Sequence, residues 1–262
     1  MYMIKILTGW SNPGGSTESF IRLTNELNTR GHDTVLYGPH DWHLDKCKSD
    51  KLKNKMEVSP DDIILVHFLN IKKRLPGKKF IYVCHEKNLK PVDKKFHHYD
   101  ACVFLHEKHR EYHKHYTGPS FLIPNLFDSF DIKKHDTYKE CAGVVGSVDA
   151  NKRTHVSIQR AKKAGYKYIY IYGDVTDTKY YQKHVEPLVD GKQVILKGFK
   201  SKSEIYSSVG AVFLSSESEC APLVLQECYQ TKTNFHGYEH ISYDINHKSN
   251  DEIIDMWIDL FK

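Results

Sequence analysis

The first part of the chain reads as a strand, a glycine-rich turn, a helix and a second strand. An apolar run at residues 3–7 enters the loop Gly9–Gly15, and Phe20, Leu23 and Leu27 then recur on one face of a helix. Two parallel strands joined through a helix form a βαβ unit, and such a sheet has to be covered by helices. This opening therefore predicts an α/β fold with a parallel sheet.

The same pattern continues along the rest of the chain. Short apolar runs bounded by polar or turn residues predict buried parallel strands at 33–37, 63–66, 80–84, 101–105, 121–123, 142–146, 168–172, 194–196 and 211–214. Helical periodicity predicts helices at 154–164, 222–230 and 251–261.

Residues 125–140 are polar and lack any periodicity, so they are predicted to form a linker. We expect two Rossmann-like domains, at 1–128 and 129–248, each with its own parallel sheet. We expect the last helix, within 249–262, to fold back onto the first domain.

Composition narrows the class of protein. The chain has 262 residues, a formal charge of +5 and six cysteines without a CxxC pair. No apolar run approaches the ~20 residues of a membrane span, and the cysteines are expected to be free thiols, so a cytoplasmic location is predicted. The positive charge suits an anionic ligand or peripheral contact with a membrane. No RNA-recognition or zinc-finger motif supports a nucleic-acid partner.

Several motifs occur in the order found in one enzyme family. They lie at Gly14–Phe20, Arg30–His32, Ile123–Asn125, Val145–Lys152 and Leu214–Glu227. Together they resemble glycosyltransferase family 4. The resemblance implies the GT-B fold, in which two Rossmann-like domains face a central cleft. It also implies retaining transfer of a sugar from a nucleotide-diphosphate donor to a hydroxyl acceptor.

The segment around residue 222 has the residue types that a diphosphate site needs. Pro222 suits the first turn of a helix, where Leu223 and Val224 present backbone N–H groups at the positive end of the dipole. Glu219, just before the helix, could contact sugar hydroxyls, and Glu227 could accept hydrogen bonds from a ribose. The resemblance gives these two glutamates the same roles, Glu219 being expected to be catalytic. The alternative is a capping carboxylate followed by a solvated helix glutamate.

Positive charge is needed where the nucleoside diphosphate leaves. Lys152 resembles the phosphate-binding lysine of the family, whereas Ser147 stands where the family has an arginine; Arg153 is a candidate substitute. Gly14 and Gly15 would let the backbone approach a donor phosphate closely. The two aspartate pairs of the sequence, Asp61 with Asp62 and Asp174 with Asp177, are poor versions of a metal motif, so metal-independent transfer without a cofactor is predicted.

Histidines at 85, 109 and 113 are candidates for a chemical role. His85 follows the strand at 80–84 and resembles the family histidine that hydrogen-bonds the transferred sugar, although a structural strand-end histidine is equally consistent with the sequence. His109 and His113 are one helical turn apart, as in a metal pair, but the motif lacks the glutamate of zinc proteases. A solvated helix face is therefore expected for them, and no metal site is predicted.

Two further classes remain open at this point. A nucleotide-sugar-binding protein with little or no turnover would explain Ser147, and a basic nucleic-acid binder would show a steep salt dependence. The sequence does not distinguish UDP, GDP and ADP sugars as donors, nor a glycan from a lipid-linked acceptor.

Overall fold

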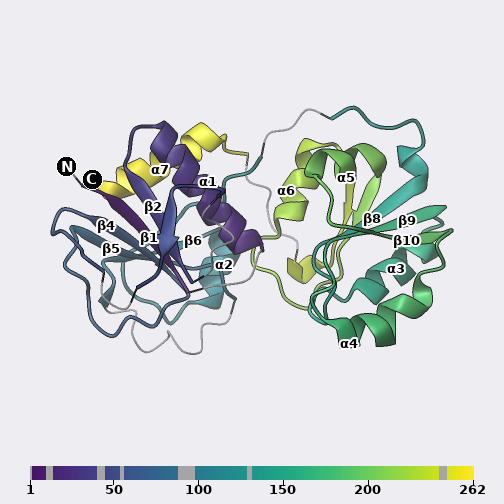
Figure 1. Cartoon of the computed structure of the whole chain (residues 1–262), viewed down its shortest axis with the longest axis horizontal. Helices are drawn as coiled ribbons and strands as arrows, with labels where there is room; N and C mark the ends of the chain where they lie inside the picture. Colours follow the sequence, from purple (N-terminus) through teal and green to yellow (C-terminus); the bar gives the residue numbers. More distant parts are fainter. Residues whose placement is uncertain are drawn as a thin grey trace. The chain divides into compact units, whose positions relative to one another are not determined.

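Two parallel sheets organise the chain in the computed structural model (Figure 1). The structure describes residues 2–9, 14–39, 45–53, 56–87, 98–128, 132–241 and 247–262. The chain divides into unit 1, comprising Met1–Phe127 with Asn246–Lys262, and unit 2, comprising Asp128–Ile245. The predicted α/β class with two parallel sheets is confirmed.

The sheet of unit 1 has the order β3-β2-β1-β4-β5-β6-β7, and all its strand pairs are parallel. Successive strands are added outward from β1 to β3, and β4 then pairs with the other side of β1, so the direction in which strands are added reverses between β1 and β4. The strands are β1 (Ile4–Thr8), β2 (Thr34–Gly38), β3 (Ser49–Lys51), β4 (Ile63–His67), β5 (Lys79–Val83), β6 (Ala101–Phe104) and β7 (Ser120–Leu122).

Helices α1 (Gly15–Thr29) and α7 (Asn250–Phe261) lie side by side on one face of this sheet (Figure 1). The core beneath them joins Phe20 and Leu27 of α1 to Ile253 and Trp257 of α7, all at most 4% exposed. Ser249 begins α7 with a reciprocal capping box to Glu252. The last helix therefore packs on unit 1, although the chain reaches it only after unit 2.

The other face of the sheet carries a second core around Ile64, Phe80, Tyr82 and Phe104. The short helix α2 (Glu107–Tyr112) follows β6 directly. Because these central strands are buried on both faces, they read in the sequence as continuous apolar runs rather than as alternating ones.

The sheet of unit 2 has the order β10-β9-β8-β11-β12, again with every pair parallel. Here the direction in which strands are added reverses between β8 and β11. The strands are β8 (Cys141–Val145), β9 (Tyr168–Tyr172), β10 (Val194–Gly198), β11 (Ala211–Phe213) and β12 (Asn234–His236). The helices are α3 (Thr154–Lys163), α4 (Thr178–Tyr180), α5 (Lys202–Ser208) and α6 (Leu223–Gln230), with single turns η3 (Tyr138–Glu140), η4 (Tyr181–Val185), η5 (Glu186–Leu188) and η6 (Glu239–Ile241).

No disulfide joins any of the six cysteines, all of which lie within the described residues, and four of them are buried. Within the described residues, no helix combines the length and apolar character that crossing a membrane would require.

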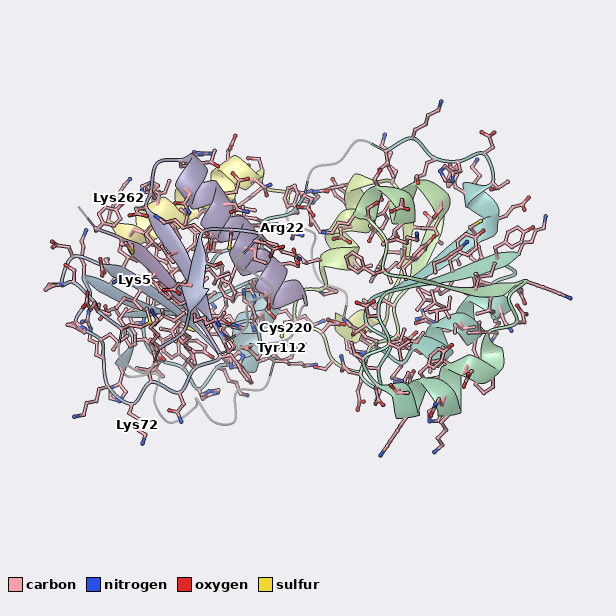
Figure 2. All side chains as sticks on the ribbon, in the orientation of Figure 1. Lys5, Arg22, Lys72, Tyr112, Cys220 and Lys262 are labelled. Carbon is pink, nitrogen blue, oxygen red and sulfur yellow. The ribbon has the colours of Figure 1, made fainter. Side chains whose placement is uncertain are left out.

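A buried ion pair lies at the amino ends of β1 and β4. Lys5 Nζ is 2.7 Å from Asp62 Oδ2, and the two side chains are 10% and 5% exposed. Asp62 also accepts the backbone N–H groups of Met3 and Ser59, at 3.2 and 2.9 Å. Figure 2 shows Lys5 among the strands, whereas Lys72 projects outward. Burial by itself would raise the pKa of Asp62, but the hydrogen bonds from Lys5 and the two amides outweigh it and lower the pKa.

We predict that Asp62→Asn lowers the free energy of unfolding by about 3 kcal/mol at pH 7, because it leaves the Lys5 ammonium buried without its counter-charge. A carboxyl whose pKa is lowered by folding stabilises above its unfolded pKa and loses that contribution as pH falls through the folded pKa. The difference between wild type and variant should therefore shrink below about pH 4. Denaturant titration measures it, with exposed Asp61→Asn as the matched control; equal losses for both variants would contradict the assignment.

Candidate functional site

The predicted donor-binding residues of unit 2 lie in the loops after β8 and β11, the two strands between which the direction of strand addition reverses. The loop after β8 carries Ser147, Lys152 and Arg153, and the loop after β11 leads through Glu219 to α6. Parallel strands bring these two loops to the same edge, and open α/β sheets bind ligands at the carboxyl ends of the strands beside such a point. Residues far apart in sequence are thereby assembled by topology alone.

Hydrogen bonds fasten the two loops together. The backbone N–H of Glu217 donates to Asn151 O at 2.8 Å. The Asn151 amide donates to Ser218 O and its Oδ1 accepts the Ser218 N–H, both at 3.2 Å. The Asn151 side chain therefore pairs with both the backbone N–H and the backbone C=O of Ser218. These hydrogen bonds fix the position of one loop relative to the other.

Lys152 and Glu219 meet within this frame. Lys152 Nζ donates to Glu219 Oε1, and the side chains are 26% and 13% exposed. A lysine and a carboxylate predicted separately, for phosphate and for sugar, are thus in direct contact. The partial exposure of both leaves the pair accessible to an incoming anion.

Ser147 and Arg153 are oriented by the turn between β8 and α3. Ser147 Oγ donates to Asp149 Oδ2 at 2.5 Å, and Asp149 Oδ1 accepts the Lys152 N–H at 2.8 Å. Arg153 is the N-cap of α3 and has φ 49°, a left-handed conformation that is uncommon for a residue with a side chain. Asp149 therefore fixes the turn that presents Lys152.

A glycine after the neighbouring strand is required for the same turn. Gly173 has φ +134°, and a Cβ at this position would lie 2.0 Å from the carbonyl oxygen of Gly146. The close approach of the two backbones lets the loops after β8 and β9 run side by side. No other residue type fits there without moving the turn.

Helix α6 begins one residue later than predicted. Pro222 is the N-cap with φ −62° and ψ 117°, rather than a residue of the first turn, and the Leu225 N–H donates to Pro222 O at 3.0 Å. Leu223 and Val224 are the first helical residues, whose N–H groups point away from the helix body. The positive end of α6 thus directly follows the segment that carries Glu219.

Glu227 is not a solvated helix glutamate, because it is 5% exposed. Its Oε2 accepts the Tyr206 hydroxyl at 2.6 Å, and its Oε1 lies 2.5 Å from Lys202 Nζ. Lys202 also pairs with Asp128 Oδ2 at 2.7 Å. A buried carboxylate needs such partners, and the two are supplied by α5, a helix that the sequence patterns did not reveal.

A chain of polar groups that we did not predict lies at the reversal point of the sheet in unit 1. Thr8 Oγ1 is 2.9 Å from His67 Nδ1, and His67 Nε2 is 2.6 Å from Glu86 Oε1. The carboxylate is the acceptor for the Nε2–H of His67, and Nδ1 faces the threonine hydroxyl. Thr8 and His67 are each 1% exposed, whereas the Glu86 side chain is 19% exposed. This series of hydrogen bonds therefore runs from the buried Thr8 to the Glu86 carboxylate, which is partly exposed at the carboxyl edge of the sheet.

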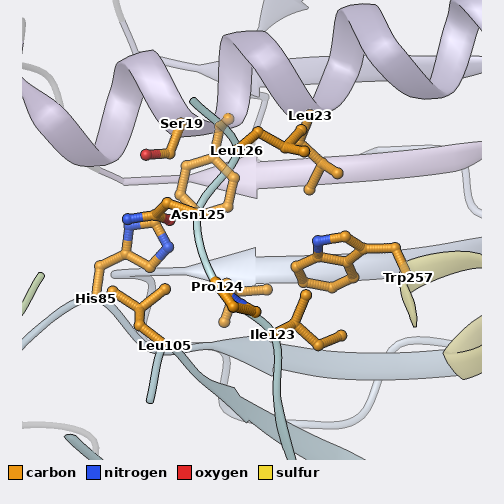
Figure 3. A pocket seen from close by; sticks show the side chains of 11 residues that line it. Ser19, Leu23, His85, Leu105, Ile123, Pro124, Asn125, Leu126 and Trp257 are labelled. Carbon is orange, nitrogen blue, oxygen red and sulfur yellow. The ribbon is translucent and has the colours of Figure 1, made fainter. Parts of the chain in front are cut away.

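His85 lies beside this chain and lines a small pocket. Its ring stacks on Phe20 with centroids 4.9 Å apart and is 5.3 Å from the His67 ring. Figure 3 shows His85 and Asn125 at one end of the pocket and Trp257 at the other. Burial, reinforced by neighbouring His67 and His109, lowers the pKa of His85 well below its ordinary value. The imidazole is therefore neutral near pH 7.

Gly14 and Gly15 stand at the start of α1. Gly14 is its N-cap, and a Cβ at Gly14 would meet no atom within 4 Å. Packing against the described residues therefore does not demand glycine at position 14.

The expectation of a solvated face for His109 and His113 is wrong. These residues are 0% and 2% exposed. Their Nε2 atoms lie 3.0 and 2.7 Å from the carbonyl oxygen of Glu86. The charged residues between them suggested an exposed helix, but α2 turns this one face toward the end of β5.

We predict that Glu86→Ala destabilises the protein by about 1–3 kcal/mol, because it leaves the buried His67 N–H without an acceptor. Glu86→Gln keeps an oxygen for that N–H and should retain most of the stability. Thermal and denaturant unfolding measure both variants, with exposed Glu111→Ala as control. An equal loss for the alanine and glutamine variants would mean that the His67 hydrogen bond does not matter.

Comparisons with known proteins identify the architecture. No model of a protein family matches the sequence, and no curated protein matches it. Solved structures match in fold: HepE of Anabaena, in complex with UDP-glucose, has a TM-score of 0.69 at 12% identity, covering 98% of this chain and 90% of that one. A glycosyltransferase from Rickettsia africae gives 0.70 at 11% identity, with 99% and 88% covered.

TarM matches with a TM-score of 0.56 at 18% identity, over 78% of this chain. That match covers 48% of TarM, so the chain spans about half of its length. The expected architecture is thereby confirmed, and the chain has the GT-B fold of two Rossmann-like domains.

Proposed function

We propose that this chain is a retaining, metal-independent glycosyltransferase that moves a sugar from a nucleotide-diphosphate donor to a hydroxyl acceptor. Unit 2 would bind the donor and unit 1 the acceptor. The observation that carries the proposal is the contact between Lys152 and Glu219 beside the start of α6. Support for a uridine-linked donor comes from the UDP-glucose complex of HepE, which shares the fold.

Donor binding would exchange the partners of the Lys152–Glu219 pair. The diphosphate offers Lys152 more negative charge than one carboxylate does, and the N–H groups of Leu223 and Val224 add positive potential beside it. Release of Lys152 frees Glu219 to accept hydrogen bonds from sugar hydroxyls. The same cationic groups then stabilise the charge that gathers on the departing diphosphate.

Glu227 would hold the ribose. Its carboxylate is oriented by Lys202 and the Tyr206 hydroxyl. Carboxylate oxygens have room for several donors, so ribose hydroxyls can add to these two without displacing them. Lys202 therefore acts as a positioning residue for the nucleoside, acting through Glu227.

Unit 1 would receive the acceptor at the carboxyl edge of its sheet. A neutral His85 can donate one hydrogen bond and accept another, which suits a hydroxyl better than an anion. Glu86, backed by His67, offers an acceptor for a second hydroxyl beside it. Gly14 and Gly15, at the start of α1, would let a phosphate group approach the backbone closely.

Two further observations support metal independence. Asp62 is engaged by Lys5, and Asp177 caps α4 through the Tyr180 N–H at 3.0 Å. These are members of the two aspartate pairs that the sequence offered as metal ligands, and each has a structural role. Lys152 and the α6 start supply positive charge at the leaving group instead.

A nucleotide-sugar-binding protein with little turnover is the second candidate. The observation that favours it is Ser147, whose hydroxyl is committed to Asp149 and carries no charge. The proposed enzyme would then hold the diphosphate with fewer cationic contacts than the family pattern has. Binding of donor without its hydrolysis or transfer distinguishes this candidate from the enzyme.

We predict that Glu219→Gln reduces transfer, or donor hydrolysis in the absence of acceptor, by at least about 100-fold, because the variant loses the charge that orders the sugar. Exposed Glu217→Gln, two positions away on the same loop, should keep the wild-type rate. Product release from nucleotide sugars measures both, after circular dichroism confirms folding. A folded Glu219→Gln protein with most of the wild-type rate would refute the role of Glu219.

We also predict that activity persists in excess EDTA without added Mg²⁺ or Mn²⁺. Lys152 and the N-terminus of α6 carry the leaving-group charge, so no cation has to be supplied with the donor. The assay compares rates before and after chelation. Loss of activity that either cation restores would contradict the prediction.

A further inference from the structure

A cluster of sulfur and nitrogen atoms lies behind His85, outside the sites assigned above. It comprises Cys84, directly after β5, His109 of α2 and His113, the C-cap of α2. All three residues are buried, at 0%, 0% and 2% exposure. The two histidines are four residues apart, so a helical turn directs both toward the same point.

The three ligand atoms of the cluster lie close to one another and to the carbonyl oxygen of Glu86. Cys84 Sγ is 3.5 Å from Nε2 of His109 and 3.5 Å from Nε2 of His113. The Glu86 oxygen lies 3.0, 2.7 and 3.4 Å from those two nitrogens and the sulfur. Zinc bonds of about 2.3 Å to sulfur and 2.0–2.1 Å to nitrogen give an S···N edge of about 3.5 Å in a tetrahedral site, which the two S···N distances match, whereas the two N···O distances have to lengthen to about 3.4 Å when zinc enters.

We propose that Cys84, His109 and His113 bind a zinc ion, with the Glu86 carbonyl oxygen at the fourth position. One thiolate and two imidazoles are a donor set that zinc prefers, whereas magnesium and calcium prefer oxygen. Because the three side chains are buried and the fourth corner is filled by the protein, this is a closed structural site. The ion would join the end of β5 to α2 and so fix the segment that carries His85 and Glu86.

Binding of zinc requires one hydrogen bond of His109 to break. The Leu105 N–H donates to His109 Nδ1 at 3.2 Å, which puts the ring proton of His109 on Nε2. Coordination through Nε2 requires that proton on Nδ1, so the Leu105 hydrogen bond must be given up. The Cys84 thiol releases its proton to solvent as the sulfur–zinc bond forms.

Metal analysis of the full chain tests the proposal independently of any transferase activity. Protein produced with zinc and then desalted should retain stoichiometric zinc by plasma mass spectrometry. Cys84→Ser and His113→Ala should each weaken zinc binding by at least about 100-fold, since even loss of an outer-shell partner costs 10–100-fold. Cys102→Ser, a buried thiol on β6, and exposed His115→Ala are matched controls that should keep the metal.

Cobalt substitution of the wild-type protein keeps the test decisive if a ligand variant does not fold. Cobalt at this site should show a thiolate charge-transfer band and the intense visible bands of tetrahedral coordination. The Leu105 amide should shift in NMR spectra when zinc is added. Wild-type protein that neither retains zinc nor gives these cobalt bands would overturn the proposal, leaving three side chains that hydrogen-bond around the Glu86 carbonyl.

Discussion

Parallel strand pairing is the constraint on which the rest of this structure depends. It brings the loop after every strand to the same edge of the sheet. Where the direction of strand addition reverses, two such loops lie next to each other and can form a binding site. In unit 2 the turn after β8 and the segment before α6 meet at this place, where Asn151 joins them. In unit 1 it brings together the ends of β1, β4 and β5, from which the Thr8–His67–Glu86 chain arises.

Two ion pairs then determine which ligand groups the proposed donor site of unit 2 can bind. Lys152 and Glu219 neutralise each other while remaining partly exposed, so a ligand that carries both phosphate and hydroxyl groups can satisfy each of them separately. Glu227 is buried and would be costly to leave unpaired, which explains why Lys202 and Tyr206 reach it. The proposed donor site therefore contains one exchangeable ion pair and one permanent one.

The sequence predicted the fold better than it predicted the site. Buried central strands give unbroken apolar runs, so most strands, and helices α1, α3, α6 and α7, were predicted within a residue or two. The strands β3 and β12, of three residues each, and helix α5 were not predicted. Their residues are polar or mixed, and their pairing depends on neighbours distant in sequence.

At the site, local patterns indicated residue types but not partners. The family resemblance of Leu214–Glu227 predicted roles for Glu219 and Glu227, yet nothing in that segment revealed the contacts with Lys152, Lys202 or Tyr206. His109 and His113 were misjudged because the polar residues around them suggested solvent. The signal that could have found their burial is the pairing of two histidines one turn apart with a cysteine at the end of a preceding strand.

Donor binding by unit 2 is the central claim, and isothermal titration calorimetry of the full chain with UDP-glucose, repeated with GDP and ADP sugars, tests it most directly. The wild-type protein should bind at least one of these donors. Lys152→Met should weaken that binding by about 10-fold or more, as expected for loss of a charge-assisted contact to phosphate. Lys163→Met, which removes an exposed lysine from the last turn of α3, should not change the affinity. Absence of binding to all three donors, or equal affinities for wild type and Lys152→Met, would contradict the account.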